Sequence, residues 1–153
     1  MLFRSYNSCI HSSLLYCSTV WGTCPKTLLL RLLRLQKHSA CLILDTDWHQ
    51  SSVSLFAKLK WLPIFLLVNL RKLVLLFNIL NNPEVPSCLK QSFHFLSSRQ
   101  ITGAITRACN LDLQLPYPRS NCGKRTFAFS VASLFNCLDS DLKELLRDRK
   151  SVV

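Results

Sequence analysis

Apolar residues recur every three or four positions through much of the chain, which is the spacing of one face of an α-helix. A first helical stripe runs through Phe3, Tyr6, Ile10, Leu14, Cys17 and Trp21. Gly22 then suits a helix C-cap. After Pro25 a second helix is predicted, and its apolar face contains Leu28, Leu32, Leu35, Ser39 and Leu42, widened by Leu29, Leu33, Ala40 and Ile43. The opposite side gathers Arg31, Arg34, Lys37 and His38, so this helix is expected to be amphipathic with a basic back.

Three further helices are predicted downstream, separated by polar or proline-containing breaks. Ser51 or Ser52 can cap a short helix that lines up Val53, Phe56 and Leu59 and ends at the segment "WLP", because a residue before proline is pushed out of the helical region. Pro63 opens the longest apolar run, 64–80, and 87–96 predicts one more short helix. A last helix is expected over roughly 127–146, with Phe127, Val131, Leu134, Leu138 and Leu142 in register.

The expected fold class is all-α, an irregular bundle of about five helices. Only 3 glycines in 153 residues leave few sites for tight left-handed turns, which disfavours a protein built from β-hairpins. Residues 97–125 hold Pro, Gly, Ser and Arg in place of a clear period and predict a poorly ordered basic loop or extended arm. The expected division is therefore a helical region 1–96, the arm 97–125, and a C-terminal helix and tail 126–153.

The charge of the chain points to acidic partners. Its 19 Lys and Arg against 8 Asp and Glu give a formal net charge of +11, and no acid precedes Asp45. Such a surface suits a polyanion such as RNA or DNA. An equally good reading is that the excess charge only keeps an apolar chain in solution.

The 8 cysteines include no C-x-x-C pair and no Cys/His set at zinc-ligand spacing, so no metal site is expected. The first 17 residues contain Arg4, His11 and several polar residues where a signal peptide needs an unbroken apolar stretch. The thiols are therefore expected to be reduced, in an intracellular protein of the cytoplasm or nucleus.

The run 64–80 is short for a membrane span of roughly 17–25 residues. Its 13 Leu, Ile, Phe and Val residues favour insertion by about 4–8 kcal/mol, whereas Arg71 and Lys72 oppose it by about 2.5–3.5 kcal/mol each. Arg71, Lys72 and Asn78 can share one side of a helix, which leaves a broad apolar face for neighbours. A buried core helix is therefore favoured, and a single membrane span is the alternative.

Acidic residues give no strong catalytic hypothesis. Asp45 and Asp47 with His49 form the one acid and histidine cluster, and a D-x-D pair can hold magnesium, but this position between two helices suits turns and caps better. Asp139 and Asp141 are likewise expected to be cap or first-turn acids. No catalytic residue and no cofactor is predicted.

Two basic sets are the candidate nucleic-acid contacts. One is the helical set Arg31, Arg34 and Lys37, and the other is the loop set Arg119, Lys124 and Arg125 with Tyr117 and Phe127 interleaved. Cations of this kind grip phosphates, and aromatic rings stack on bases. A solvated face beside a core helix gives the same pattern, so both interpretations stay open.

Four segments occur in an informative order: "SCIHSSLLYCSTVWG", "LLRLLRLQKHSACLIL", "LFAKLKWLPIFLLVNLRKLVLLFNILNNPEVPSCL" and "LQLPYPRSNCGKRTFAFSVASLFNCL". Together they resemble the C-terminal region of reverse transcriptases from LINE-type, non-LTR retrotransposons of the jockey-like kind, over roughly 5–142. The resemblance implies a helical thumb-like and post-thumb region that supports the polymerase palm and holds template RNA or primer.

Individual residues carry this resemblance. They are Tyr16 and Trp21 in "LxYxxxxWG", Leu35, Gln36 and Lys37 in "LQK", Trp61, Leu62 and Pro63 in "WLP", and Arg125 and Phe127 in "RxF". The chain departs from the family where further arginines are expected, since it has His38 and Cys41 there, and it has Phe135 in place of a tryptophan before Asn136. These departures weaken the implied phosphate grip and fit a copy that has decayed.

The paired palm aspartates of a "YxDD"-type strand, which would bind two magnesium ions, are missing from the 153 residues. The expectation is a transposon-derived fragment that is catalytically inert alone, with RNA or DNA, the polymerase palm of a longer parent and other copies of itself as partners. A small basic nucleic-acid-binding module and a single-span membrane protein are the alternatives. Leu28, Leu32, Leu35 and the face of 64–80 would lack cover outside the parent, which predicts self-association.

Overall fold

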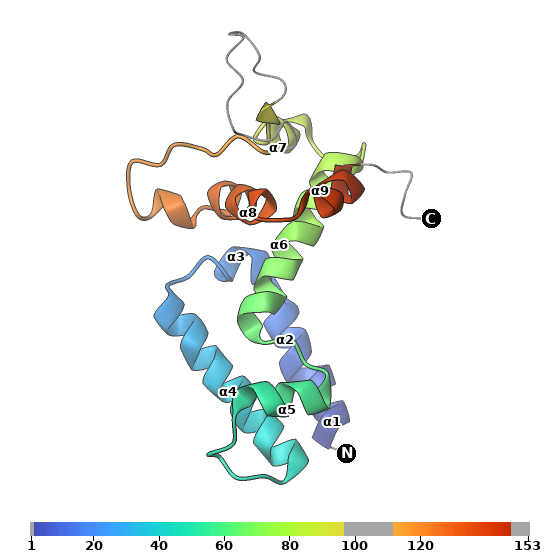
Figure 1. Ribbon diagram of the computed structural model, residues 1–153, viewed down its shortest axis with the longest axis vertical. Coiled ribbons are helices and arrows are strands. Elements are labelled where there is room, and N and C mark those ends of the chain that lie inside the picture. The colour runs from blue at the N-terminus through green and yellow to red at the C-terminus, as the bar shows by residue number, and fades with distance from the viewer. Residues whose placement is uncertain (1, 97–111, 148–153) are drawn as a thin grey trace. The chain divides into compact units, whose positions relative to one another are not determined.

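The computed structural model of the chain describes residues 2–96 and 112–147, and 67% of these residues are helical, so the expected all-α class is confirmed. Within them the one β-type pairing is an isolated antiparallel bridge between Phe95 and Leu113. The chain forms two compact units, Met1–Arg71 and Lys72–Val153, which are described separately (Figure 1). The predicted division at residues 96 and 125 stays a prediction.

The first unit begins with a broken helical segment: α1 (Leu2–Ser5), the π-helical turn η1 (Tyr6–His11), α2 (Ser12–Leu15) and α3 (Ser18–Trp21). The single stripe predicted here is therefore wrong. Tyr16 is extended and Cys17 is left-handed with φ 48°, so the helix stops between α2 and α3. The indole Nε1 of Trp21 donates to the Tyr16 carbonyl at 2.7 Å, which satisfies an acceptor that the break releases.

Gly22 does follow α3 as its C-cap, but it is not left-handed, because its φ is −67°. Its physical role is close packing. A Cβ at this position would overlap the Ser18 carbonyl oxygen and the side chain of Val68. The absence of a side chain therefore lets the end of α3 lie against α6 (Ile64–Asn81), whose residues 64–71 belong to the first unit and whose residues 72–81 belong to the second.

The helices α4 (Lys26–Leu44) and α5 (Ser52–Leu59) follow. The apolar face predicted for α4 is rotated relative to the observed one. Leu28, Leu35 and Leu42 are exposed, and the residues that are buried are Leu29, Gln36, Ala40 and Cys41. On α5, Leu55 and Phe56 are buried while Val53 is exposed. Ala40, Cys41, Leu55 and Phe56 form one small core of this unit, and Ile64, Leu67 and Val68 form another with Leu32 and Trp21 packed against it.

The long apolar run forms α6 and ends one residue later than predicted. Asparagines terminate it: Asn81 Nδ2 donates to the Phe77 carbonyl at 3.0 Å, and Asn82 Oδ1 accepts from the Glu84 backbone N–H at 3.0 Å. Arg71 and Asn78 are exposed as expected, but Lys72 is only 5% exposed, so the prediction that these three share a polar side is wrong for Lys72.

The second unit contains α7 (Ser87–Lys90), the 3₁₀ turn η3 (Gly123–Arg125), α8 (Phe127–Asn136) and α9 (Ser140–Arg147). The helix predicted over 87–96 ends at Lys90, because the following residues extend and pair with the chain near Leu113. Leu96 N–H donates to the Asp112 carbonyl at 2.9 Å, and Gln114 N–H donates to the His94 carbonyl at 2.7 Å. The last predicted helix is two helices, separated by residues 137–139.

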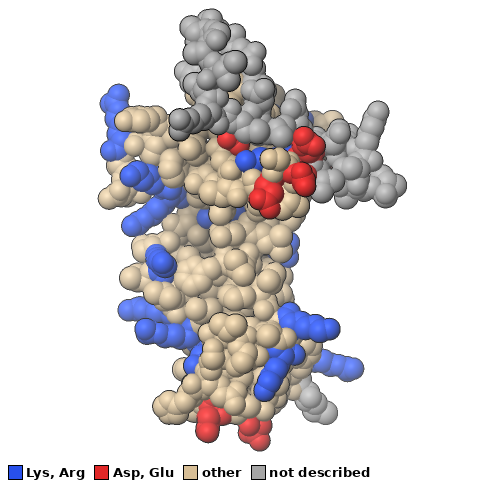
Figure 2. All heavy atoms as spheres, viewed as in Figure 1, with Lys and Arg blue, Asp and Glu red and all other residues tan. Residues whose placement is uncertain are grey.

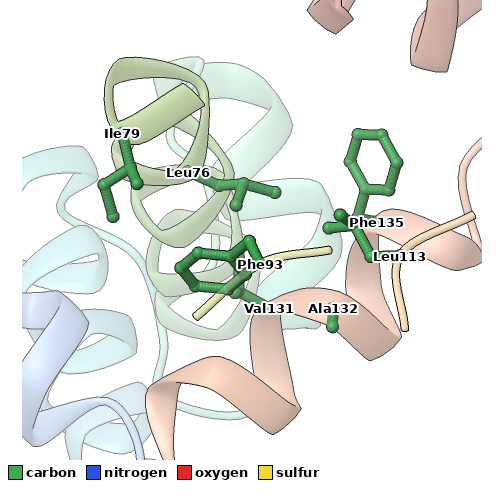
Figure 3. Packing of buried hydrophobic residues seen from close by; sticks show 7 residues of the cluster. All are labelled: Leu76, Ile79, Phe93, Leu113, Val131, Ala132 and Phe135. Carbon is green, nitrogen blue, oxygen red and sulfur yellow. The ribbon is translucent and has the colours of Figure 1, made fainter. Parts of the chain in front are cut away.

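A single apolar cluster holds this unit together, and it contains Leu76, Ile79, Phe93, Leu113, Val131, Ala132 and Phe135 (Figure 3). Leu113 is 1% exposed although it falls within the predicted arm. Within the predicted loop or extended arm, residues 112–114 are extended and are anchored to the core of the unit through Leu113, and 97–111 lie outside the described residues. Leu113 is an apolar residue between polar neighbours, and its extended backbone carries it into the core.

Candidate nucleic-acid interface

The loop set Arg119, Lys124 and Arg125 lies on one compact turn of the second unit, and all three residues are exposed. Local hydrogen bonds define this turn. Ser120 Oγ accepts from the Gly123 N–H at 3.2 Å, and Thr126 Oγ1 donates to the Gly123 carbonyl at 2.8 Å. A Cβ on Gly123 would come within 2.7 Å of Pro118 Cβ, so the turn needs glycine for its tight packing.

The two aromatic residues that flank these cations have different roles. Tyr117 is 95% exposed, so both faces of its ring are open to solvent. Phe127 is half-buried and packs edge-on against Phe93, with ring centroids 6.2 Å apart. The structure therefore leaves Tyr117 available for stacking and uses Phe127 to attach the turn to the core of its unit.

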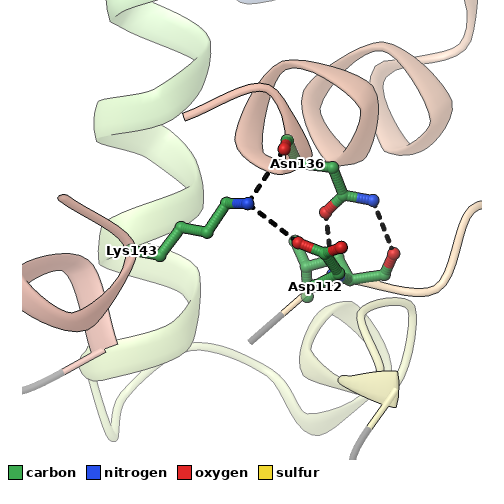
Figure 4. A network of polar contacts seen from close by, with 4 residues as sticks. Asp112, Asn136 and Lys143 are labelled. Atoms are coloured by element: carbon green, nitrogen blue, oxygen red, sulfur yellow. Dashed lines mark hydrogen bonds and ion pairs between the residues drawn. The ribbon is translucent and has the colours of Figure 1, made fainter. Parts of the chain in front are cut away.

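A polar network holds the segment that leads into this turn (Figure 4). Asn136 Oδ1 accepts from the Leu113 N–H at 2.9 Å, and Asn136 Nδ2 donates to the Leu113 carbonyl at 2.9 Å. Lys143 Nζ donates to Asp112 Oδ1 at 2.8 Å and to the Asn136 carbonyl at 2.9 Å. This network fixes residues 112 and 113 to α8 and α9, and thereby fixes where the loop set begins.

Sequence reasoning missed Asn136 and Lys143 as structural residues. Their partners are 23 and 31 positions away, and no periodic pattern reports a contact of that kind. Their positions within α8 and α9 give no local signal of these contacts. Leu142, which was expected to lie in register with the core, is 47% exposed, and Lys143 is buried in its place.

The helical set lies on α4 in the first unit, where Arg31 and Arg34 are exposed and Lys37 is half-buried. Its neighbours along the exposed side of the helix are apolar, since Leu28, Leu35 and Leu42 are 45%, 61% and 62% exposed. Because the two basic sets belong to different units, each is a separate candidate surface. Figure 2 shows Lys and Arg side chains projecting from the viewed surface, with fewer acidic side chains among them.

The residues of the family-like motifs mostly build the first unit. Gln36 is 2% exposed, and its side-chain amide bridges the backbone on both sides of Pro63. Its Nε2 donates to the Leu62 carbonyl at 2.9 Å, and its Oε1 accepts from the Ile64 N–H at 3.0 Å. This pair of bonds joins the motif "LQK" on α4 to the motif "WLP" and to the first residue of α6.

Trp61 of the second of these motifs stacks on the buried ring of Tyr6, with centroids 3.8 Å apart. Burial raises the pKa of the Tyr6 hydroxyl, and Gln36 lowers it by a smaller amount. The hydroxyl makes no hydrogen bond of normal geometry within the described residues, so Gln36 offsets only part of the effect of burial. Tyr16 of the first motif is 77% exposed.

Two of the four acidic candidates lie at helix ends. Asp45 is the left-handed C-cap of α4 with φ 48°, and Asp141 lies in the first turn of α9, as a cap interpretation predicts. Across residues 2–96 and 112–147, no three His, Cys, Asp or Glu side chains come together as a metal-binding group. Cys9, Cys17, Cys24, Cys41, Cys88, Cys122 and Cys137 are free thiols, and Cys109 lies outside the described residues.

Among the described helices, α6 is long and apolar enough to cross a membrane, but 33% of it is buried inside the protein, and a core helix of a soluble protein meets the same criteria.

Comparisons with known proteins find no matching family, no similar curated protein and no similar solved structure.

Proposed function

We propose that this chain is a transposon-derived fragment of a LINE-type reverse transcriptase, equivalent to a thumb-like and post-thumb region, which has no polymerase activity by itself and retains non-specific binding of single-stranded RNA or DNA. The order of four family-like segments along the chain motivates this proposal. A small basic nucleic-acid-binding module of other origin is the second candidate, because it would need the same loop set.

The observation that carries the proposed origin is the bridge from Gln36 to the backbone around Pro63. The motifs "LQK" and "WLP" are separated by 23 residues in the sequence, and nothing in a chance similarity requires them to touch. Here the central residue of one motif donates to the Leu62 carbonyl of the other at 2.9 Å, and it accepts at 3.0 Å from the N–H of Ile64, the residue that directly follows that motif. Motifs that depend on each other physically support a shared origin with a family in which they occur together.

The DNA upstream of the coding sequence tests this origin. A decayed copy of a retrotransposon would leave a reading frame that encodes fingers and palm segments, including a degraded "YxDD" motif, before the sequence that encodes Met1. We expect such a frame. A complete and unrelated 5′ region with no trace of a polymerase frame would overturn the proposed origin.

Nucleic-acid binding is tested separately, by titrating a labelled single-stranded RNA at several salt concentrations. Replacing Lys124 and Arg125 together by Glu should weaken binding to all sequences alike. Because two phosphate contacts are lost, the slope of log affinity against log salt should fall by about 1.4. The matched control is Arg4→Glu with Lys58→Glu, which makes the same change of charge at exposed positions of the other unit. Binding that is absent at low salt, or that the control weakens equally, would contradict the proposal.

A single membrane span through α6 is the remaining alternative, and its length and composition are what favour it. Alkaline carbonate extraction of the expressed protein distinguishes it from the proposed function. We expect the protein to leave the membranes. It should then be found in the supernatant, or as an aggregate that sinks through a density gradient. Retention with the membranes after carbonate treatment would favour the span.

A further inference from the structure

The exposed side of α4 is a ridge of three leucines beside a row of basic residues. Leu28, Leu35 and Leu42 follow one another at seven-residue intervals, so they lie close to one line along the helix and extend over about 21 Å. Arg31 and His38 lie seven residues apart next to that line, and Arg34 lies beyond them. We name this surface the α4 ridge. The α4 ridge takes no part in the core of the unit, because α4 packs into that core through Leu29, Gln36 and Ala40 on its other side.

Trp48 extends the same surface. It lies just beyond the C-terminal end of α4, is 51% exposed, and packs edge-on against His38 with ring centroids 4.6 Å apart. Tryptophan is enriched where proteins meet the interface between lipid and water. An exposed tryptophan next to an exposed row of leucines and arginines is a costly arrangement for a surface that only contacts water.

From the charge and the apolar ridge we infer that α4 lies on the surface of an anionic lipid membrane, with Leu28, Leu35, Leu42 and Trp48 entering the boundary between head groups and acyl chains and with Arg31 and Arg34 binding lipid phosphates. Leucines on one side and arginines at the margin are the pattern of helices that lie in the plane of a membrane interface. This inference does not depend on the proposed origin of the chain.

Charge complementarity favours this occupant over the others. Residues 26–44 contain no Asp or Glu, and the two acids of the first unit, Asp45 and Asp47, follow the end of the helix. A second copy docked on the ridge would bring Arg31 and Arg34 close to the same cations of its partner. A nucleic acid would satisfy the cations but would leave three leucines against phosphates and sugars, whereas a lipid surface satisfies both kinds of side chain.

Flotation of vesicles in a density gradient tests the inference, because bound protein rises with the vesicles while protein aggregates sink. Vesicles of phosphatidylcholine with phosphatidylserine should carry the full chain upward. With vesicles of phosphatidylcholine alone, the amount of protein that floats should be at least about tenfold smaller. Replacing Leu28 and Leu35 together by Ser should reduce flotation about tenfold without loss of helical circular dichroism, because both side chains are already exposed.

Replacing Arg31 and Arg34 together by Glu should abolish the preference for phosphatidylserine. The matched control is again Arg4→Glu with Lys58→Glu, in which Lys58 lies on α5, a helix that packs against the opposite face of α4. Equal flotation with neutral vesicles, no effect of the leucine variant, or an equal effect of the control would each overturn the inference. The inference would also be overturned if the unsubstituted chain bound no vesicles and the leucine variant lost RNA binding. That result would assign the ridge to nucleic acid. Dissociation of a dimer by that variant, without vesicle binding, would assign the ridge to a second copy.

Discussion

Asn136 pairs with both backbone groups of Leu113, accepting from its N–H and donating to its carbonyl, each at 2.9 Å. One side chain thus completes the hydrogen bonding of a fully buried residue whose neighbouring strand bonds come from residues 112 and 114. The arrangement is equivalent to one step of a β-ladder in which an amide side chain replaces the second strand. It explains how an extended segment is held within a helical unit.

Replacing Asn136 by Ala should release this segment. The change leaves the N–H and the carbonyl of Leu113 without partners, which costs about 1–3 kcal/mol for each group that stays buried. Site-resolved amide hydrogen exchange should show loss of protection at residues 112–114 by at least about tenfold. Asn121→Ala, at an exposed position of the same unit, is the matched control and should leave the protection unchanged.

The ion pair between Lys143 and Asp112 predicts a second effect in the same unit. The side chains are 8% and 19% exposed, so removal of one leaves the other in a poorly solvated position. Lys143→Met should destabilise the unit by about 1.5–3 kcal/mol. Adding Asp112→Asn should recover part of this loss, because the remaining charge is removed. A double-mutant cycle measured by hydrogen exchange on α8 reports the coupling, and strictly additive effects would show that the pair contributes nothing specific.

The long apolar helix illustrates what the sequence predicts well. Ile64 to Leu80 is bounded by Pro63 on one side and by two asparagines and a proline on the other, and these residues act through local backbone chemistry. The predicted and observed ends therefore agree within one residue. The same holds for the ends of α5, which begins after Ser51 and ends before "WLP", although the Ser51 hydroxyl makes no capping hydrogen bond.

The face of α4 illustrates what the sequence could not predict. Leucines lie both on the buried side of this helix and on its exposed ridge, so hydropathy alone does not decide which of them are buried. The side that is buried contains Gln36, a polar residue that periodic analysis counts against burial, and its two bonds to the backbone around Pro63 select that side. Contacts between positions 26 and 28 residues apart fix the rotation of the helix, and a local pattern contains no information about them.

The exposure of the loop set could be predicted from the sequence, but the contacts that attach this loop to its unit could not. Arg119, Lys124 and Arg125 are exposed as charged residues in a loop usually are, whereas the attachment of that loop through Leu113 depends on Asn136.

The break at Cys17 could not be predicted from the sequence either. A stripe of apolar residues at helical spacing runs through this position, and the helix nevertheless breaks there because Cys17 is left-handed.

Tyr6 predicts how the first unit responds to alkaline conditions. Burial raises the pKa of its hydroxyl above the usual 10.0, so the folded chain retains the proton at a pH where the unfolded chain has lost it. The free energy of unfolding should therefore be constant below about pH 10 on this account and fall above it, by at most about 1.4 kcal/mol per pH unit. The fluorescence of Trp61, which stacks on Tyr6, can follow urea unfolding in a variant that carries Trp21→Phe and Trp48→Phe. Adding Tyr6→Phe should remove that slope, and an unchanged slope would assign it to other groups.

Tyr117 predicts a preference for unpaired bases, provided that the loop set binds nucleic acid. Its ring is almost fully exposed, and stacking of one base on an aromatic ring contributes about 1–3 kcal/mol. Tyr117→Ala should weaken binding of single-stranded RNA about tenfold and leave binding of a duplex of the same sequence unchanged, since paired bases cannot reach the ring. Tyr117→Trp should preserve binding. Equal losses for both forms of RNA would show that the side chain only positions the loop.

Self-association should depend on α6 rather than on α4. Leu66 and Leu70 lie four residues apart on the part of α6 that belongs to the first unit, and they are 53% and 47% exposed. Burial of several hundred Å² at about 25 cal/mol per Å² contributes roughly 5–10 kcal/mol, which is comparable to the stability of a whole domain. On α4 the repulsion between Arg31 and Arg34 of two copies opposes the same gain. Leu32, which was expected to lack cover, packs against the cluster around Ile64 and takes no part.

The isolated chain should therefore be helical by circular dichroism, elute as a mixture of associated forms and show no sharp thermal transition. Leu66→Gln with Leu70→Gln should shift the population toward monomer in sedimentation velocity, because both side chains lie at the surface and their replacement leaves the buried side of α6 intact. Leu28→Gln with Leu35→Gln is the matched control on α4 and should shift it less. If the unsubstituted chain is monodisperse and melts in one cooperative transition, the exposed side of α6 needs no partner. The chain would then be a self-sufficient domain rather than a fragment.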